Sequence, residues 1–345
     1  PDLTWEKAIK WNVGADVKFW GDRIGLTFDY FMEHRDNILC NRNTVPTIIG
    51  ISASNLPAYN MGRMRNSGWD GEISVGDHIG DWSYFVKANF TYAHNKILEQ
   101  DEVIRNEDYL YRTGLRYGQF FGYVADGIFN FWEEVNAAGR PEYVMANNNN
   151  KIQPGDVRYV DINGDGKIND DDQVPIGYSN FPEIMYGISL GGSYKNLDIS
   201  LLFQGATHVS NMPSRRIMRG FYEYTGANRD LLKSWSYERF VNNQKIVYPR
   251  YGVNGVGHNY LTSTYWLEDA SYLRLKNVEV GYTFRQESLK KAGIGSIRIY
   301  VNGSNLLTWT DMLPGQDPEV ANAGVTNSEP YPVTRVFNFG LNVNF

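Results

Sequence analysis

The 345-residue sequence has little cysteine, no long apolar run and little excess charge, and each shortage excludes a class of protein. Cys40 is the only cysteine, so no disulfide can form within the chain. No window approaches the roughly 18 to 20 apolar residues of a membrane helix, which excludes a helical membrane protein. The net charge is -6 with acids and bases interspersed, so there is no basic patch for phosphates and we expect no nucleic-acid partner.

Signals for export and for catalysis are also scarce. The first residues, PDLTWEKAIKW, have no basic start, apolar core or small-residue cleavage site, so the chain is either cytosolic or the later part of something longer. No GxSxG, HExxH or phosphate-binding loop occurs. The histidines lie far apart without metal-ligand spacing: His34, His78, His94, His208 and His258. We therefore do not expect an enzyme, and a barrel-type lipase is the catalytic alternative left open.

What the sequence does have is a regular alternation of apolar and polar residues. In the last segment, TRVFNFGLNVNF, every second residue from Phe337 to Phe345 is apolar, and Asn or Gly fills the positions between. A period of two is typical of a β-strand with one apolar and one polar face. The pattern predicts nine strands, around 11–19, 24–32, 69–75, 82–92, 184–190, 197–203, 273–284, 297–301 and 337–345. The phase changes within 273–284, so we predict a β-bulge near Lys276 and Asn277.

The connections between these strands alternate between short and long. The short ones cover 20–23, 76–81, 195–196 and 285–295. The long ones cover about 39–66, 97–182, 210–271 and 310–333. Outer-membrane barrels have short periplasmic turns and long extracellular loops, and their strands need about 9 to 11 residues to cross the apolar layer. The predicted fold class is therefore all-β, a transmembrane antiparallel β-barrel that contacts the lipid of a Gram-negative outer membrane.

The number of predicted strands indicates a larger barrel. Bacterial single-chain barrels have an even number of strands. If Phe345 lies at the periplasmic end, nine strands place residue 1 on the extracellular side. We therefore expect residues 1–345 to be the C-terminal portion of a longer barrel.

Several segments, taken in order, resemble one family. They are PDLTWEKAIKWNVGADVKFWGDRIGLTFDYF, NSGWDGEISV, GDVRYVDINGDGKINDDDQVPIGYSNFPEIMYGISLGGSYKNLDISLLFQG, WLEDASYLRLKNVEVGYTF and IRIYVNGSNLLTWT. Across essentially its whole length, the chain is similar to the C-terminal part of the SusC/RagA family of TonB-dependent outer-membrane transporters.

The resemblance implies a barrel of about 22 strands, to which this chain would supply nine. The implied partners are the N-terminal plug and barrel portion of the same parent protein, TonB through that missing portion, and a SusD-like surface lipoprotein that acts as a lid. The implied function is TonB-dependent import of oligosaccharides or oligopeptides, and the assembly could be a dimer of transporter–lipoprotein pairs. A barrel-based surface adhesin and a calcium-dependent binding module stay open as alternatives.

The segment DINGDGKINDDDQ has the spacing of a calcium-binding loop, with Gly166 at the sixth position, where the turn requires it. The candidate ligands at positions 1, 3, 5, 7, 9 and 12 are Asp161, Asn163, Asp165, the Lys167 carbonyl, Asn169 and Asp172. Position 12 is Asp rather than Glu, and the flanks contain Pro154 and Pro175 and are not helical. We predict a structural Ca²⁺ in the 97–182 loop, and the alternative is a polar turn that needs no metal.

Two further groups of residues are candidates for function. Aromatic residues of the long loops could contact substrate or lid, namely Trp132, Tyr222, Tyr224, Trp235, Tyr265 and Trp266. They could equally pack the loops on one another, because interfaces concentrate the same residue types. The terminal Phe345 resembles the signal read by the outer-membrane assembly machinery, and the alternative is that it simply ends the last strand.

Overall fold

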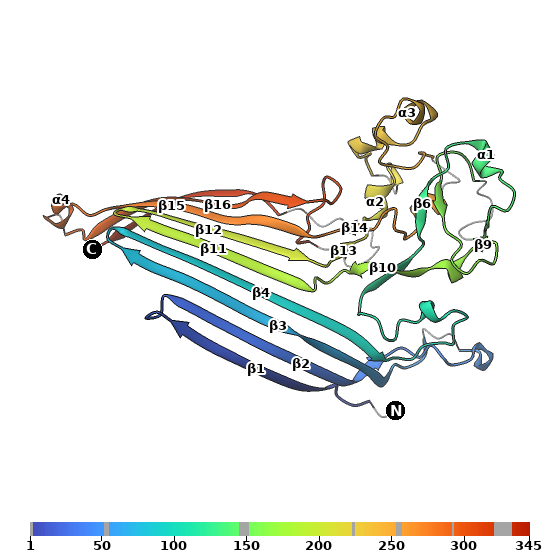
Figure 1. The fold of residues 1–345 in the computed structure, drawn as a ribbon, viewed down its shortest axis with the longest axis horizontal. Coiled ribbons are helices and arrows are strands. Elements are labelled where there is room, and N and C mark those ends of the chain that lie inside the picture. The colour runs from blue at the N-terminus through green and yellow to red at the C-terminus, as the bar shows by residue number, and fades with distance from the viewer. Residues whose placement is uncertain are drawn as a thin grey trace.

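The computed structural model describes residues 3–51, 55–144, 152–222, 225–252, 257–291, 293–320 and 333–345. Its main element is one sheet of nine strands, each antiparallel to its neighbours and lying in the order of the chain (Figure 1). The strands are β1 (Lys7–Phe19), β2 (Ile24–Cys40), β3 (Tyr59–Ile79), β4 (Trp82–Glu99), β11 (Ile184–Tyr194), β12 (Leu197–Thr207), β15 (Tyr272–Phe284), β16 (Ser296–Thr310) and β17 (Val336–Asn344). The nine predicted strands are confirmed.

Some strands are longer than the alternation indicated. β3 begins at Tyr59, so the first long connection runs over 41–58 and is shorter than the predicted 39–66. The residues that begin β3, YNMGRMRN, do not alternate in polarity. A strand that extends beyond the apolar layer has water on both faces, so its ladder continues without the pattern that a lipid-facing strand needs.

The predicted bulge in β15 is confirmed. The pairing of β15 with β16 shifts between Leu275 and Asn277, and the pairing with β12 shifts between Leu202 and Phe203. Lys276 therefore has no register partner on either neighbouring strand. The extra residue returns Val278 and Val280 to the face on which Leu273 and Leu275 lie.

One face of the sheet is apolar and exposed. Phe28, Phe90 and Phe339 expose 45%, 43% and 81% of their surface. On this face the rings of Tyr30 and Trp69, which are direct cross-strand neighbours, lie 4.7 Å apart between centroids. So large an apolar surface is unfavourable in water but is covered in a lipid bilayer. The opposite face carries polar side chains and is described with the candidate site.

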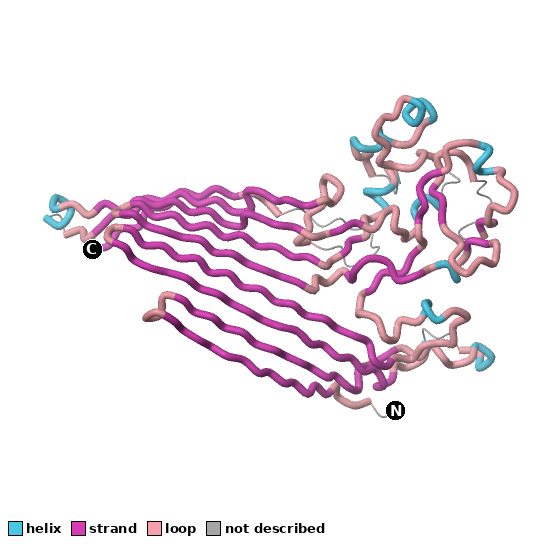
Figure 2. Tube along the Cα trace, viewed as in Figure 1, coloured by secondary structure: helices cyan, strands magenta, loops and turns pink. Residues whose placement is uncertain are grey.

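The two ends of the sheet differ in their connections (Figure 2). At one end the strands join through short turns, and the longest of these carries α4 (Glu287–Lys291). At the other end the connections run over 41–58, 100–183, 208–271 and 311–335. They contain the small strands β5 (Gln119–Gly122), β6 (Ala125–Ile128), β7 (Glu142–Tyr143), β8 (Val157–Tyr159), β9 (Lys167–Ile168), β10 (Val174–Ser179), β13 (Ser210–Asn211) and β14 (Glu268–Asp269). They also contain α1 (Trp132–Val135), α2 (Arg215–Met218), α3 (Tyr237–Val241) and the short 3-10 turns η1 (Thr47–Ile49), η3 (Asp108–Leu110), η4 (Asp170–Asp172), η6 (Arg229–Lys233) and η7 (Gly257–Tyr260).

The two longest connections pack against each other, and we call the described residues of 119–183 and 208–271 the loop lobe. Tyr123 forms a β-bridge with Ser263 across these connections. The buried side chains of the lobe form apolar clusters, of which one contains Met212, Met218, Tyr248, Tyr260 and Trp266 and another Tyr123, Val157, Tyr159 and Ile168. The lobe therefore has a core of its own. Among the described residues, no helix is long and apolar enough to span a membrane.

Candidate functional site

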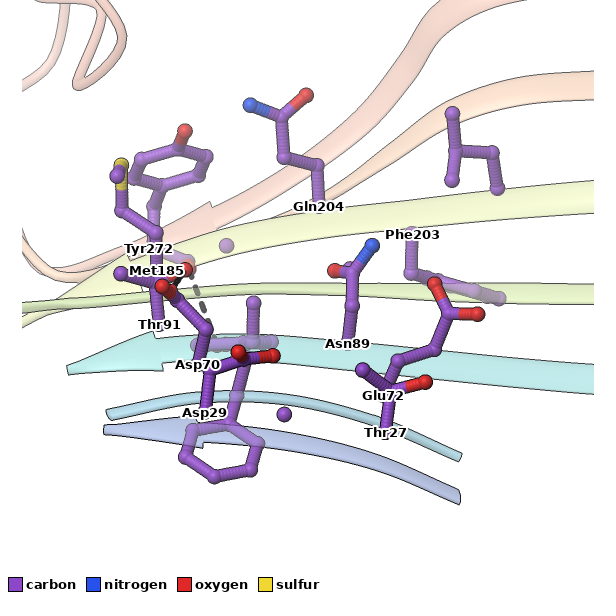
Figure 3. A pocket seen from close by; sticks show the side chains of 16 residues that line it. Thr27, Asp29, Asp70, Glu72, Asn89, Thr91, Met185, Phe203, Gln204 and Tyr272 are labelled. Atoms are coloured by element: carbon purple, nitrogen blue, oxygen red, sulfur yellow. Dashed lines mark hydrogen bonds between the residues drawn. The ribbon is translucent and has the colours of Figure 1, made fainter. Parts of the chain in front are cut away.

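The polar face of the sheet contains a cavity of about 490 Å³, which we call the inner hollow. Figure 3 shows Asp70 and Glu72 of β3, Asn89 of β4 and Gln204 of β12 rising from their strands on the same side. Thr91 Oγ1 donates a 2.6 Å hydrogen bond to Asp70 Oδ1. Carboxylates, amides and hydroxyls are groups that bind a polar ligand through hydrogen bonds. The inner hollow is therefore suited to a hydrophilic molecule.

Two carboxylates lie directly across from each other in this hollow. Asp29 of β2 pairs in register with Asp70 of β3, and like charges at such positions are destabilising. The Asp29 carboxylate lies over Gly14 of β1, at the place where a Cβ atom of any other residue would stand. Glycine at position 14 therefore leaves room for Asp29 to turn away from Asp70, and both charges can remain on the wall.

A second cavity, of about 620 Å³, lies nearer the long connections, and we call it the mouth hollow. Its lining residues are Glu6, Glu33, Arg35, Ile38, Met64, Asn66, Ala93, Asn95, Tyr117, Phe181 and Pro182. They come from before β1, from β2, β3 and β4, and from residues 117 and 181–182 of the 100–183 connection. The mouth hollow thus mixes apolar, amide and charged groups at the end of the sheet where the long connections begin.

The charged groups of the mouth hollow neutralise one another. Arg35 donates to Glu33 Oε1 from Nε at 2.9 Å and from Nη2 at 2.7 Å, and its Nη1 lies 3.2 Å from Glu6 Oε2. Lys10 Nζ lies 3.2 Å from Glu33 Oε2. Two carboxylates and two cations are thus paired along this part of the rim, and their charges cancel.

Behind the mouth hollow, one buried carboxylate joins four segments of the chain. Glu183 exposes 6% of its side chain, and its Oε1 lies 2.6 Å from Arg116 Nε and 2.6 Å from His94 Nδ1. Its Oε2 lies 3.3 Å from His208 Nδ1, and the His208 ring stacks on Tyr178 at 4.6 Å. The Glu183 cluster therefore fixes the ends of β4, β11 and β12 and the turn at residue 116 relative to one another.

The environment of Glu183 favours its charged form. Burial alone would raise its pKa, but the hydrogen bond from His94 and the positive charge of Arg116 outweigh burial and lower the pKa below the usual range. The carboxylate is therefore ionised at neutral pH and holds Arg116 as its counter-ion.

A second buried carboxylate holds the loop lobe together. Asp156 is fully buried, and its Oδ1 lies 2.5 Å from Arg250 Nε and accepts a 2.8 Å hydrogen bond from Asn259 Nδ2. His258 Nε2 lies 3.1 Å from the other oxygen. Burial would raise the pKa of Asp156, yet hydrogen bonds and charge from His258 and Arg250 lower it. Residues about 100 positions apart, in different connections, are joined by this one side chain.

The predicted calcium loop forms a turn closed by its own backbone amides. The two carboxylate oxygens of Asp161 accept hydrogen bonds from the N–H groups of Gly164 and Gly166, each at 2.8 Å. Asp172 is fully buried, and its oxygens accept from the N–H groups of Ile162 and Asn169, each at 2.8 Å. Over the described residues, no three His, Cys, Asp or Glu side chains converge as a metal site would require. Calcium binding by Asp161, Asn163, Asp165, Lys167, Asn169 and Asp172 stays a prediction.

A sequence model of the TonB-dependent receptor-like β-barrel family matches residues 1–306. The chain belongs to this family. TonB-dependent receptor P3 of Formosa agariphila is 28% identical over 369 residues, which covers the whole chain and 34% of that protein. TonB-dependent receptor SusC of Bacteroides thetaiotaomicron is 25% identical over 360 residues, which covers the whole chain and 32% of that protein.

A comparison of structures gives the same fold. The structure of the RagAB peptide transporter superposes on this chain with a TM-score of 0.73 and 23% sequence identity. The superposition covers the whole of this chain and 36% of the transporter chain. The resemblance to the SusC/RagA family is confirmed, and the chain is a β-barrel component of the outer membrane. It spans about a third of the length of the relatives that it matches.

The aromatic residues of this TonB-dependent receptor chain that we predicted to contact substrate or lid lie in different environments. Trp132 exposes 54% of its surface, whereas Trp266 exposes 3%, lies in the lobe core and donates from Nε1 to the Asn259 carbonyl. Trp235 Nε1 donates to Asn130 Oδ1, and Tyr265 Oη donates to the Val247 carbonyl. Tyr222 is half-buried with the Arg219 guanidinium over its ring, and Tyr224 lies outside the described residues. Trp132 thus presents the largest open surface of the described candidates, and contact with substrate or lid stays a prediction for all of them.

Phe345 is exposed after the end of β17, and its role in assembly stays a prediction. Sequence reasoning missed Glu183, Arg116 and Phe181. Histidines at 94 and 208 lack metal-ligand spacing, yet both contact one carboxylate. The order of the strands carried a signal, because strands that follow each other along the chain usually pair antiparallel. Ala93 and Glu183 lie at the same end of two such strands, so residues next to them are close in space.

Proposed function

We propose that this chain forms part of a TonB-dependent importer that carries oligosaccharides or oligopeptides across the outer membrane. The observation that supports the proposal is the contrast between the two faces of one sheet. The apolar face suits lipid, and the polar face holds the inner and mouth hollows in sequence along β2, β3 and β4. A path for a hydrophilic solute requires such a wall, whereas a barrel that only displays loops does not. The names SusC and RagAB peptide transporter, which belong to relatives, agree with nutrient import.

The proposal includes partners. A plug and the remaining strands of the same parent protein would complete the barrel, TonB would supply energy through the plug, and a SusD-like lipoprotein would cover the loop lobe. Exposed aromatic side chains of the lobe such as Trp132 suit a protein interface. Two such transporter–lipoprotein pairs could then form a dimer. The predicted Ca²⁺ would act as a structural ion that holds the 161–172 turn.

Deletion of the complete gene tests the proposal. The deletion strain should lose growth on one class of nutrient, either oligosaccharide or oligopeptide, and the wild-type gene should restore it only when TonB is active. Co-purification in mild detergent should bring a surface lipoprotein with the receptor. Unchanged growth on every nutrient combined with weaker attachment to surfaces would contradict import and support the adhesin alternative.

A further inference from the structure

Two aromatic rings stand open in the mouth hollow. Tyr117 and Phe181 stack with ring centroids 6.0 Å apart and an interplanar angle of 26°, and they expose 56% and 52% of their surface. Both line the cavity. Two exposed rings side by side are unfavourable in water unless something covers them, because each leaves a large apolar area hydrated.

The backbone around these rings is held by polar contacts. Arg116, next to Tyr117, and Glu183, two residues after Phe181, form the 2.6 Å ion pair of the Glu183 cluster. Asn95 Oδ1 of β4 accepts a 2.7 Å hydrogen bond from the Tyr117 N–H. The rings are therefore held in place before binding by a buried carboxylate and a strand side chain. This reduces the conformational entropy that is lost when a ligand binds.

A glycine brings the two ring-bearing segments close together. Gly118 has a φ of +78°, and a Cβ atom there would meet the Asn180 side chain and the Phe181 ring. Glycine is the residue that adopts this backbone conformation without strain and leaves that space open. The turn after Tyr117 can therefore lie flat against Phe181.

The charges of the mouth hollow favour a neutral ligand. Arg35, Lys10, Glu33 and Glu6 are already paired with one another, and Arg116 is paired with Glu183. A peptide terminus or a uronic acid would have to compete with these partners. The amide side chains of Asn66 and Asn95 border the same cavity and suit hydroxyl groups.

We propose that Tyr117 and Phe181 form a stacking subsite for a pyranose ring of a neutral oligosaccharide at the extracellular end of the barrel wall. This inference rests on the import function proposed above and names its substrate class. One face of the sugar ring lies against the aromatic pair, and Asn66 and Asn95 bind its hydroxyls. The Glu183 cluster positions both rings without touching the sugar.

The test uses the receptor expressed from its complete gene together with its lipoprotein partner. The probes are maltohexaose, cellohexaose, xylohexaose, mannohexaose and hexa-alanine, and binding is measured by calorimetry. Wild type should bind at least one of the hexasaccharides, and Tyr117→Ala and Phe181→Ala should each weaken that binding about tenfold. Tyr117→Phe and Phe181→Tyr keep the rings and should stay within about threefold of wild type. Tyr237→Ala, which removes an exposed ring of the loop lobe, serves as the matched control.

The outcomes separate the subsite from the import function. If wild type takes up a hexasaccharide and both alanine variants bind it as wild type does, the subsite is wrong and import stands. If the receptor binds and imports only hexa-alanine, the sugar assignment is overturned and import again stands. If the complete receptor supports uptake of none of the probes and its deletion changes growth on no nutrient, the proposed function fails and the subsite fails with it.

Discussion

The nine-stranded sheet and the loop lobe are stabilised in opposite ways. The sheet exposes its apolar side chains and buries few of them, whereas the lobe buries Phe129, Val157, Tyr248 and Trp266 almost completely. Asp70 and Glu72 of the sheet line the inner hollow and are partly exposed, while in the lobe Asp156 is fully buried in contact with Arg250 and His258. The sheet therefore depends on lipid and on neighbouring strands, and the lobe depends on its own core. One chain thus combines a sheet with an exposed apolar face and a lobe with a buried apolar core.

The strongest test of this difference is removal of the Asp156 carboxylate. Asp156→Ala leaves the half-buried Arg250 guanidinium without its carboxylate and buried His258 without its partner, and breaking a buried ion pair costs about 3–5 kcal/mol. We expect the lobe to open while the sheet stays folded in detergent. Hydrogen exchange should rise at the amides around Val157 and Tyr248 and should not change along β3 and β4.

A matched variant and a pH series sharpen the result. Asp126→Ala removes an exposed partner of Arg158 and should cost less than about 1 kcal/mol. The pKa of Asp156 is lowered, so its contribution is complete above the ordinary value of 3.8 and is lost as the pH falls below that value. Equal exchange in Asp156→Ala and Asp126→Ala would show that the lobe does not depend on this carboxylate.

The second test addresses the sheet. Leu201 lies on the apolar face of β12, opposite Leu190 and Val278, and its neighbour Ser200 lies on the polar face. Arginine in place of a lipid-facing residue near the bilayer midplane costs about 2–4 kcal/mol. Leu201→Arg should therefore reduce the amount of heat-modifiable, folded barrel in the outer membrane. Ser200→Arg should leave that amount close to wild type, and equal losses in both variants would refute the assignment of faces.

The difference between the sheet and the loop lobe also explains how much of each could be predicted from the sequence. Strands of the sheet are visible in the sequence because lipid requires an apolar residue at every second position. The bulge at Lys276 could be located because the phase changes within a single strand. The turn with the spacing of a calcium loop could also be found in the sequence, because all its residues lie between Asp161 and Asp172.

The clusters that hold the lobe and the mouth could not be predicted in this way. Asp156 and Asn259 are 103 residues apart, and Glu183 joins His94, Arg116 and His208 from three other segments. Which residues meet depends on strand register and on how two long connections fold over each other. Strand register and the packing of the two connections leave no local pattern in the sequence. A single acidic residue in a loop therefore gives no sequence signal that tells whether its side chain is solvated or buried.

The third test acts where the sheet meets the lobe. Glu183→Gln keeps the size of the side chain but removes the charge that pairs with Arg116, so Tyr117 and Phe181 lose part of their support. We expect hexasaccharide binding to weaken about tenfold, or roughly 1.4 kcal/mol, with an unchanged level of folded receptor. In wild type the same loss should appear in acid, because the lowered pKa of Glu183 keeps its contribution intact above the ordinary value of 4.5 and removes it below that value. Glu134→Gln, in a half-buried pair of the lobe with Arg158, should bind as wild type does.

The smallest expected effect is that of calcium, and it tests whether the lobe needs an ion in addition to its core. The 161–172 turn already satisfies its carboxylates with backbone amides, so an ion would add to a formed turn and would not create it. For a dissociation constant of about 10⁻³ M, 5 mM Ca²⁺ should stabilise the lobe by about 1 kcal/mol. Limited proteolysis after removal of calcium with a chelator should accelerate at this turn and nowhere in the sheet.

Asp165→Ala should abolish the difference, because Asp165 is exposed and its loss removes a candidate ligand without opening the core. Magnesium at the same concentration is the control ion, since it requires a tighter octahedral set of ligands than this turn offers. Identical digestion with calcium, with magnesium and with chelator would show that this turn needs no metal.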